Sequence, residues 1–272
     1  ADGEIRPDAR WPPRAARARG DPVTAPRPVR PCRGVVPPRA VLWKTVRMKI
    51  QLRHTPSFGV ARLLLAGNEP VTVQGGALMA YSAAMTVDAN TNGGVLAGLK
   101  RSVLSGESFF VSTVTAPPQG GWADVVGTLP GDIIALPITA GRDQFITRGS
   151  WVANSYGVST ETKWAGARNL IGGEGGFGLR AFGEGQALVS VYGALDVMDL
   201  GPGEQVIIDT GHVVSYDMGM SVELRQSSSS LWRTVKSGEG FVFLFTGPGR
   251  VLLQSRNPRD LNAYITSHSA NS

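Results

Sequence analysis

The sequence predicts an all-β fold in which three similar units surround a pseudo-threefold axis, with short helical pieces in the loops. Two observations lead to this prediction: short runs of β-branched and aromatic residues alternate with glycine-rich turns, and two motifs recur three times in the same order. Outside the loops, no stretch keeps a helical hydrophobic period for three turns. Each unit is too small to bury much apolar surface alone, so we expect the three to pack together.

The first 47 residues are expected to form a disordered leader rich in arginine and proline. They hold eleven lysines and arginines against four acidic residues, and nine of the 18 prolines. Proline removes backbone donors and like charges repel, so such a stretch cannot build a core. A basic arm for nucleic acid or membranes and a mitochondrial transit peptide are two interpretations. We favour a third, an over-long gene start with Met48 as the true initiator.

The basic charge of the chain belongs to this leader. The whole sequence has a formal net charge of +6, whereas residues 48–272 hold sixteen lysines and arginines against seventeen acidic residues. A near-neutral body gives no reason to expect a nucleic-acid partner. The single cysteine, Cys32, excludes an internal disulfide, and no apolar run is long enough for a transmembrane helix. We therefore expect a cytoplasmic protein.

The first repeated motif is a fourteen-residue window that begins with glycine and has apolar residues at its third and fourth positions. The three copies are Gly76–Ala89, Gly149–Thr162 and Gly211–Leu224. The thirteenth position is acidic in each copy: Asp88, Glu161 and Glu223.

The second motif is a glycine-glutamate block that follows each window. Its copies are Leu104–Phe110, Ile171–Phe177 and Lys236–Val242, with the glutamates Glu107, Glu174 and Glu239. Two motifs in one order and in three copies predict a single triplicated domain over 48–262, with repeats at about 48–135, 136–200 and 201–262. Residues 263–272 are expected to be a flexible tail.

Strands are expected where β-branched and aromatic residues cluster, at Val71–Val73, Gln205–Ile208, Val242–Phe245 and Val251–Gln254. Turns are expected at the intervening clusters of glycine and proline, namely Gly75-Gly76, Gly201-Pro202-Gly203 and Gly247-Pro248-Gly249. Many short strands at regular spacing are typical of β-sandwiches or barrels.

Several of these motifs together resemble the altered-inheritance-of-mitochondria family, twenty-four type. They are Gly106–Phe110, Leu129–Ile133, Arg148-Gly149-Ser150, Asp209–Val214 and Phe245–Val251, and the likeness covers residues 48–261. The resemblance implies a fold similar to the tryptophan RNA-binding attenuation protein (TRAP), in the double-stranded β-helix group. It also implies a link to mitochondrial biogenesis, since mitochondrial members are associated with inner-membrane architecture and respiratory function. It implies no catalytic residue.

Histidine is scarce, which argues against a metal enzyme. The three histidines are His54, His212 and His268, and no two are close in sequence as a cupin-like site would require. Assembly of His54 and His212 with an acid over long range is the remaining route to a metal. His212 is absent from the repeat pattern, so His212 and the nearby Asp209 are the candidate ligand-binding residues. The structural alternative makes His212 a turn residue after a glycine with special dihedral angles.

The repeated acids have a functional and a structural interpretation. If the units surround an axis, Glu107, Glu174 and Glu239 form one carboxylate ring able to hold a cation, and Asp88, Glu161 and Glu223 another. We prefer the structural interpretation, in which each glutamate accepts backbone N–H groups in its own glycine turn. No metal and no cofactor are therefore expected.

Two motif matches do not indicate catalysis. Gly173–Gly178 fits the dinucleotide-binding glycine pattern, but it is a copy of the glycine-glutamate block followed by a strand rather than a helix. Ser105-Gly106-Glu107 lacks the glycines of a nucleophile elbow. We therefore predict that the protein is not an enzyme.

An apolar, glycine-rich loop, Gly93–Leu104, is echoed by Leu231–Lys236. Either these pieces plug the open ends of the β units, or Leu99 and Trp232 form an exposed patch for contact with a subunit or a membrane surface. The predicted function is a non-enzymatic scaffold or interaction protein, homo-oligomeric, with a protein or membrane-surface partner. The alternative is a small-molecule- or metal-binding, cupin-like β-helix protein with weak enzymatic activity, using a cleft near His212.

Overall fold

The computed structural model describes residues 48–88, 111–165, 176–226 and 241–269. All of them belong to the second of the two units into which the chain divides, Lys44–Ser272. The predicted leader, residues 1–47, lies outside the described residues.

The described chain is almost entirely β, as the sequence predicted. The first stretch contains β1 (Lys49–Arg53), β2 (Val60–Leu65), β3 (Pro70–Gln74), β4 (Leu78–Tyr81), β5 (Thr86–Asp88), β6 (Val111–Thr115) and β7 (Gly121–Val126). The second contains β8 (Gly131–Ile138), β9 (Gln144–Thr147), β10 (Trp151–Ser155), β11 (Val158–Ala165), β12 (Gly176–Gly183) and β13 (Gly185–Tyr192). The third contains β14 (Leu195–Leu200), β15 (Gln205–Asp209), the 3-10 turn η2 (Thr210–His212), β16 (Val213–Asp217), β17 (Ser221–Gln226), β18 (Phe241–Thr246), β19 (Gly249–Gln254) and α2 (Pro258–Ser269).

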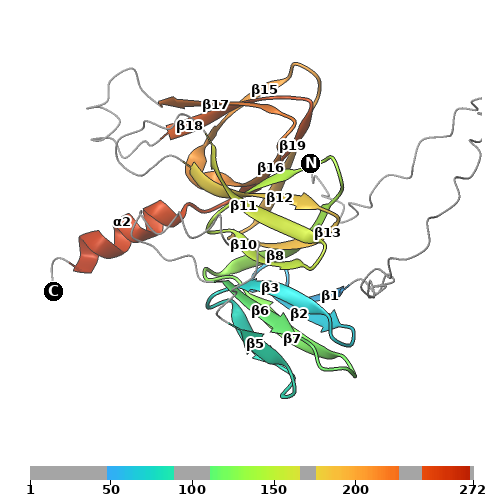
Figure 1. Ribbon diagram of the computed structural model, residues 1–272. Coiled ribbons are helices and arrows are strands. Elements are labelled where there is room, and N and C mark those ends of the chain that lie inside the picture. The colour runs from blue at the N-terminus through green and yellow to red at the C-terminus, as the bar shows by residue number, and fades with distance from the viewer. Residues whose placement is uncertain (1–47, 89–110, 166–175, 227–240, 270–272) are drawn as a thin grey trace, which may run out of the picture. The chain divides into compact units, whose positions relative to one another are not determined.

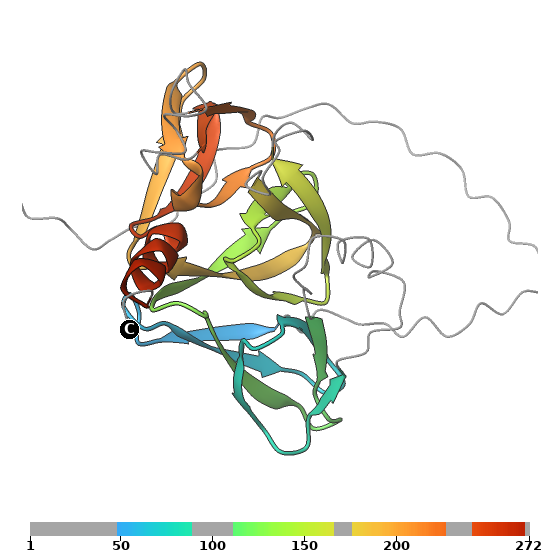
Figure 2. The same ribbon diagram turned by 90° about the vertical axis from the view of Figure 1, so that its left-hand side faces the viewer.

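These strands form four sheets, which we number 1 to 4. Their strand orders are β1-β2-β7-β4, β5-β6-β3-β10-β13-β8, β11-β12-β9-β16-β19-β14 and β15-β18-β17. In Figure 1, the labelled strands of sheet 4 lie at the top, above those of sheet 3, and those of sheet 1 lie at the bottom, beside β3, β5 and β6 of sheet 2. Figure 2 shows the same succession after a quarter turn.

One pairing order occurs in all three stretches. The trios β2-β7-β4, β8-β13-β10 and β14-β19-β16 are arranged alike, and so are β3-β6-β5, β9-β12-β11 and β15-β18-β17. The last strand of each first trio has an irregular register at the same place in the repeated window: between Leu78 and Ala80, between Trp151 and Ala153, and between Val213 and Ser215. The pseudo-threefold axis stays a prediction.

Two ladders, which we call the internal junctions, join neighbouring stretches. In sheet 2, β10 pairs with β3, and Ala153 lies opposite Val73. In sheet 3, β16 pairs with β9, and Ser215 lies opposite Ile146. Counted from the window glycines, these paired positions correspond. Each six-stranded sheet is therefore shared by two stretches of chain.

Apolar cores separate successive sheets. The core between sheets 1 and 2 includes Leu63, Val125, Val73 and Leu188; that between sheets 2 and 3 includes Trp151, Val189, Ile146 and Leu252; and that between sheets 3 and 4 includes Phe145, Tyr216, Phe243 and Phe245. In the third core, the ring of Tyr216 stacks on Phe145 with centroids 4.6 Å apart. Fully burying one such side chain stabilises the fold by about 1.5–3 kcal/mol, so these layers hold the sheets together.

The four runs predicted as strands are confirmed, because they form β3, β15, β18 and β19. The predicted turns lie between β3 and β4, between β14 and β15, and between β18 and β19. Gly76 and Gly203 have φ of +85° and +77°, in the left-handed region that favours glycine.

The helix α2 corrects the sequence analysis, which found no helical period of three turns and expected a tail over 263–272. The helix covers Pro258–Ser269 and has no buried residue among those described. An apolar stripe, on which the periodicity test depends, is therefore weak here. A start signal was available: Asn257 Oδ1 accepts the N–H of Arg259 at 2.9 Å, and proline occupies the first helical position.

Candidate functional site: a cleft beside the C-terminal helix

A cleft of about 830 Å³ lies where the chain leaves β3, β9 and β15. Corresponding turns of the three stretches therefore contribute to one cavity, and α2 supplies another wall. The lining residues are Gln74, Thr128, Leu129, Thr147, Arg148, Gly149, Ser150, Ser190, Tyr192, Thr210, Gly211, Val213, Gln254, Asn257, Pro258, Arg259, Leu261, Asn262 and Ile265.

The cleft combines apolar and cationic side chains. Leu261 and Ile265 are one helical turn apart on α2 and line it together with Leu129. Arg148 and Arg259 bring positive charge to the same lining. Arg259 Nη2 donates a hydrogen bond to Thr210 Oγ1 at 2.6 Å, which ties the first turn of α2 to η2. Such a mixture suits an organic ligand or a peptide with a negatively charged group.

Asp209, one of the two predicted ligand-binding residues, caps the short turn η2. Its Oδ1 accepts the backbone N–H of Gly211 at 2.7 Å. The same oxygen lies 3.6 Å from Nη2 of Arg259. Asp209 is not among the cleft-lining residues. It therefore shapes the cleft by fixing the turn and the arginine.

His212, the second predicted residue, faces the end of β19. Its Nδ1 lies 2.7 Å from the carbonyl oxygen of Gln254. A carbonyl oxygen can only accept, so Nδ1 carries the hydrogen. The amide of Gln254 donates to the Gly211 carbonyl at 2.8 Å and accepts the N–H of Tyr192 at 3.1 Å. His212 belongs to this network beside the cleft and does not line the cleft itself.

The glycine before His212 is needed for space and not for its dihedral angles. Gly211 has no left-handed φ, so the expectation of special dihedrals at this position was wrong. A Cβ at this position would come within 2.4 Å of Oδ1 of Asn257, the residue that caps α2. A side chain at position 211 would therefore displace the Asn257 carboxamide that caps α2.

The histidines and acids do not converge on a metal site within the described ranges. His54 lies in the turn after β1 with φ of 59°, and the His268 ring lies 4.2 Å from that of Tyr264 on α2. No group of three His, Cys, Asp or Glu side chains in the described part of the chain is placed to hold a metal ion.

Two of the thirteenth-position acids pair with arginines. Glu161 accepts from Arg180 at 2.8 Å, across the ladder of β11 and β12. Glu223 accepts from Arg225 at 2.8 Å, and this hydrogen bond lowers the pKa of Glu223. Asp88 is exposed at the end of β5. The second acid set (Glu107, Glu174, Glu239) and the predicted interaction residues (Leu99, Trp232) lie outside the described residues.

A second cavity, of about 610 Å³, contains opposite charges. Its lining includes Arg142, Asp143, Lys163, Arg180 and Asp217. Arg180 Nε donates to Asp143 Oδ2 at 2.6 Å, and an Arg142 nitrogen lies 3.7 Å from an Asp217 oxygen. Positive and negative groups therefore neutralise each other in this cavity.

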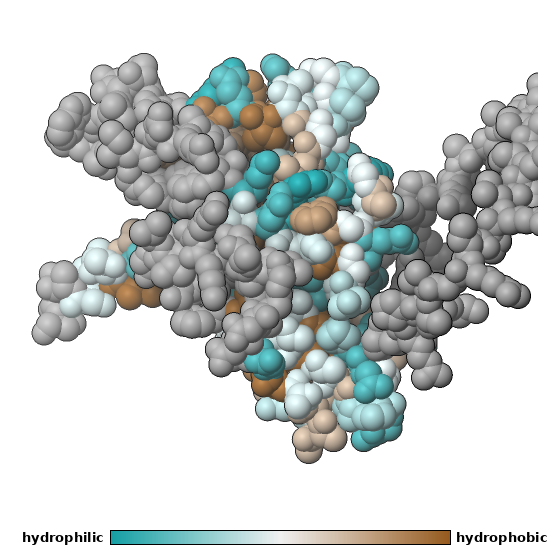
Figure 3. All heavy atoms as spheres, in the orientation of Figure 1, coloured by the Kyte–Doolittle hydropathy of each residue, from teal (hydrophilic) through white to brown (hydrophobic). Residues whose placement is uncertain are grey.

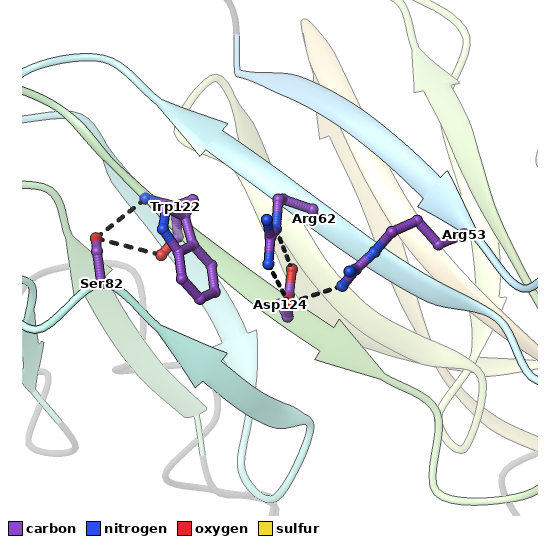
Figure 4. Close-up of polar contacts among 5 residues, drawn as sticks. All are labelled: Arg53, Arg62, Ser82, Trp122 and Asp124. Carbon is purple, nitrogen blue, oxygen red and sulfur yellow. Dashed lines mark hydrogen bonds and ion pairs between the residues drawn. The ribbon is translucent and has the colours of Figure 1, made fainter.

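Sheet 1 carries a third charged cluster on its outer face (Figure 4). Asp124 is 2 % exposed and accepts two hydrogen bonds of 2.8 Å from Arg62 and one of 2.7 Å from Arg53. The bonds from Arg62 are the main cause of a lowered pKa at Asp124. The Arg62 guanidinium also lies 4.0 Å from the Trp122 ring centroid. Each charged group here has a partner, so the cluster is structural.

Comparison with known proteins identifies the family. The family model described as mitochondrial biogenesis AIM24 matches residues 50–256. The chain belongs to the AIM24 family. This confirms the resemblance deduced from the motifs.

Solved structures agree on the fold. The crystal structure of protein SPYM3_0169 from Streptococcus pyogenes matches with a TM-score of 0.69 and 24 % sequence identity, over 82 % of this chain and all of that one. This likeness shows that the two chains share a fold. No curated protein matches the sequence. None of the helices in the described ranges has the length and hydrophobicity to span a bilayer.

Proposed function

We propose that this AIM24-family protein is a non-enzymatic interaction protein, a β scaffold that acts by binding other chains. The main support for the proposal is that large hydrophobic side chains are exposed on the surface. Ten are exposed in the described part: Leu52, Phe58, Met79, Tyr81, Val87, Tyr156, Val197, Ile207, Tyr264 and Ile265. Grouped exposed apolar residues are typical of interaction sites.

The grouping of these residues supports the proposal. Met79 and Tyr81 are both on β4, and Tyr264 and Ile265 are neighbours on α2. Figure 3 shows apolar surface on α2 and around sheet 4. The charged clusters, by contrast, use their arginines and carboxylates to bind each other. Apolar surface is therefore what this protein offers to a partner.

The repeat, the cellular location, the oligomeric state and the membrane contact are proposed from the sequence. We interpret the chain as three copies of one TRAP-like unit and expect a cytoplasmic homo-oligomer that touches the membrane periphery. The support for membrane contact is the apolar loop around Leu99 and its echo around Trp232. Replacing both residues with aspartate should abolish liposome flotation while the circular dichroism spectrum is retained. Global unfolding of that variant would favour a plugging role instead.

A second function, ligand binding in the cleft beside α2, is favoured by one observation. The cleft has the volume of a small-molecule site and contains Arg148 and Arg259 beside apolar side chains. On this alternative, His212 and Asp209 support the wall that the ligand contacts. A metal or weak enzymatic activity would belong to the same cupin-like alternative.

Native mass spectrometry of the purified full chain separates the two functions. An interaction protein should give integer multiples of the polypeptide mass with nothing else bound. A stoichiometric small molecule or metal on every chain would overturn the proposal and favour the cleft. Arg259→Ala is the diagnostic variant, because it should release a cleft-bound ligand without changing the number of chains. Arg225→Ala, an exposed arginine on β17, is its control.

A further inference from the structure

Both internal junctions join corresponding strands, and one further junction of the same kind is absent within the described residues. β3 pairs with β10 and β9 pairs with β16, so the corresponding strand β15 would pair with a β4. Within the described residues, β15 pairs only with β18, and β4 only with β7. Sheet 4 and sheet 1 lie at opposite ends of the row of sheets in Figure 1. The two strands of this absent ladder, β15 and β4, therefore lie in the first and last sheets of the row.

We propose that β15 of one copy pairs antiparallel with β4 of a second copy, which joins sheet 4 of the first to sheet 1 of the second. The inference rests on the proposed role as an interaction protein and names one of its interfaces. Counting from the window glycines, the internal registers place Ala80 opposite Ile208 and Tyr81 opposite Ile207. The contact is head-to-tail, so it generates a ring or a filament instead of a twofold dimer.

Burial at the corresponding positions supports this register. In the internal junction of sheet 3, Tyr216 lies opposite Phe145, and these residues are 6 % and 1 % exposed. At the open ends, Tyr81 and Ile207 are 44 % and 59 % exposed. In sheet 3 an aromatic residue and a large apolar residue thus occupy these two positions and are buried, whereas on the edge strands β4 and β15 such residues are exposed. In sheet 2 the corresponding pair is Asn154 and Thr72. Pairing of a second copy would cover both Tyr81 and Ile207.

The two edges also lack the usual protection against pairing. Edge strands are commonly blocked by lysine, proline or a bulge. β4 and β15 contain no lysine and no proline. The register irregularity of β4 offers no protection, because β10 and β16 have the same irregularity and both form junctions. Neither edge is therefore blocked by lysine, by proline or by a bulge of its own.

Disulfide trapping between copies tests the register. In a full-length Cys32→Ser background, a Tyr81→Cys chain is mixed with an Ile207→Cys chain. Opposite residues of an antiparallel ladder have Cα atoms about 4.5–5.5 Å apart, within disulfide range. We expect at least ten-fold more cross-linked dimer than when Tyr81→Cys is mixed with Gln205→Cys, which is two residues out of register. Equal trapping in both mixtures would contradict the proposal.

Oligomer mass gives the second readout. Ile207→Asp should reduce the assembly to single chains by light scattering, while the melting temperature stays within about 2 °C because the side chain is exposed. Val197→Asp, on the edge strand β14, is the matched control and should keep the assembly. A wild-type protein that is a single chain in solution would overturn the proposal. If Ile207→Asp still assembles, and Tyr81→Cys and Ile207→Cys chains do not cross-link, the β4–β15 interface is wrong, while the proposed interaction role still stands.

Discussion

Sheets 1 and 2 share the same arrangement of three strands, but one corresponding cross-strand pair is charged in sheet 1 and apolar in sheet 2. In sheet 1, Arg62 on β2 lies opposite Asp124 on β7. The corresponding pair in sheet 2 is Ala135 and Leu188. Leu188 is fully buried in the core between sheets 1 and 2. The outer face of sheet 1 has no preceding sheet among the described residues, so a charged pair can occupy it.

The position of a sheet in the row, and not its strand pairing, therefore sets whether a face is apolar or charged. A backbone ladder needs only N–H and C=O groups, which every stretch supplies. A face requires apolar side chains only if another sheet excludes water from it. At the outer face, Arg62, Arg53 and Trp122 cover Asp124 instead.

The largest effect is expected inside the row, at the core between sheets 3 and 4. Phe145→Ala should reduce the free energy of unfolding by about 3–5 kcal/mol, because it leaves a cavity beside Tyr216. Urea denaturation measures the loss. Phe58→Ala, at a residue that is 69 % exposed, is the control and should change stability by less than about 0.5 kcal/mol. Equal losses would show that this core does not hold the sheets.

The charged pair of sheet 1 should cost less to break. Asp124→Ala leaves Arg62 and Arg53 without their carboxylate, and we expect a loss of about 3 kcal/mol. Combining Asp124→Leu with Arg62→Ala copies the pair found in sheet 2 and removes Asp124 together with Arg62. Only Arg53 then lacks its carboxylate, and its side chain is 38 % exposed to water. This double variant should lie within about 1 kcal/mol of the wild type in the same denaturation assay. A double variant as unstable as the single one would mean that the outer face needs its charges.

The same charged pair should make the free energy of unfolding depend on pH. Since Arg62 lowers the pKa of Asp124, the folded state favours the ionised carboxylate. The resulting stability is fully present above the ordinary carboxyl pKa of about 4 and is lost as the pH falls through the lowered value. Unfolding free energies at pH 7 and pH 3 should therefore differ less in Asp124→Asn than in the wild type. An unchanged difference would remove Asp124 from the acid response.

The smallest effect is expected at α2, which has no buried residue in its described part. Asn257→Ala removes the helix cap and should cost the helix about 1 kcal/mol. The helix packs little, so the global melting temperature should hardly change, while amide exchange in residues 259–262 accelerates about five-fold. Asn262→Ala, within the helix, is the control. A large global loss would show that α2 stabilises the sheets.

The sequence predicted more of the fold than of the candidate site. β-branched runs such as 71–73 and 251–254 can be recognised locally, because strand preference and turn glycines depend on near neighbours. The cleft could not be predicted in this way, since Gln74, Arg148 and Thr210 are far apart in the chain. Asp209 and His212 were found only as neighbours of that cleft, because a local motif indicates a turn but not which way a side chain faces.

By itself, the sequence determined the all-β class, the family and the three-fold recurrence of motifs, because these depend on residue types and their spacing. Only the tertiary structure decided which faces are covered and which edges stay open. Tyr81 and Tyr216 lie in corresponding strands, yet one is exposed and the other buried. Burial depends on the neighbouring sheet, and that neighbour comes from a distant part of the chain.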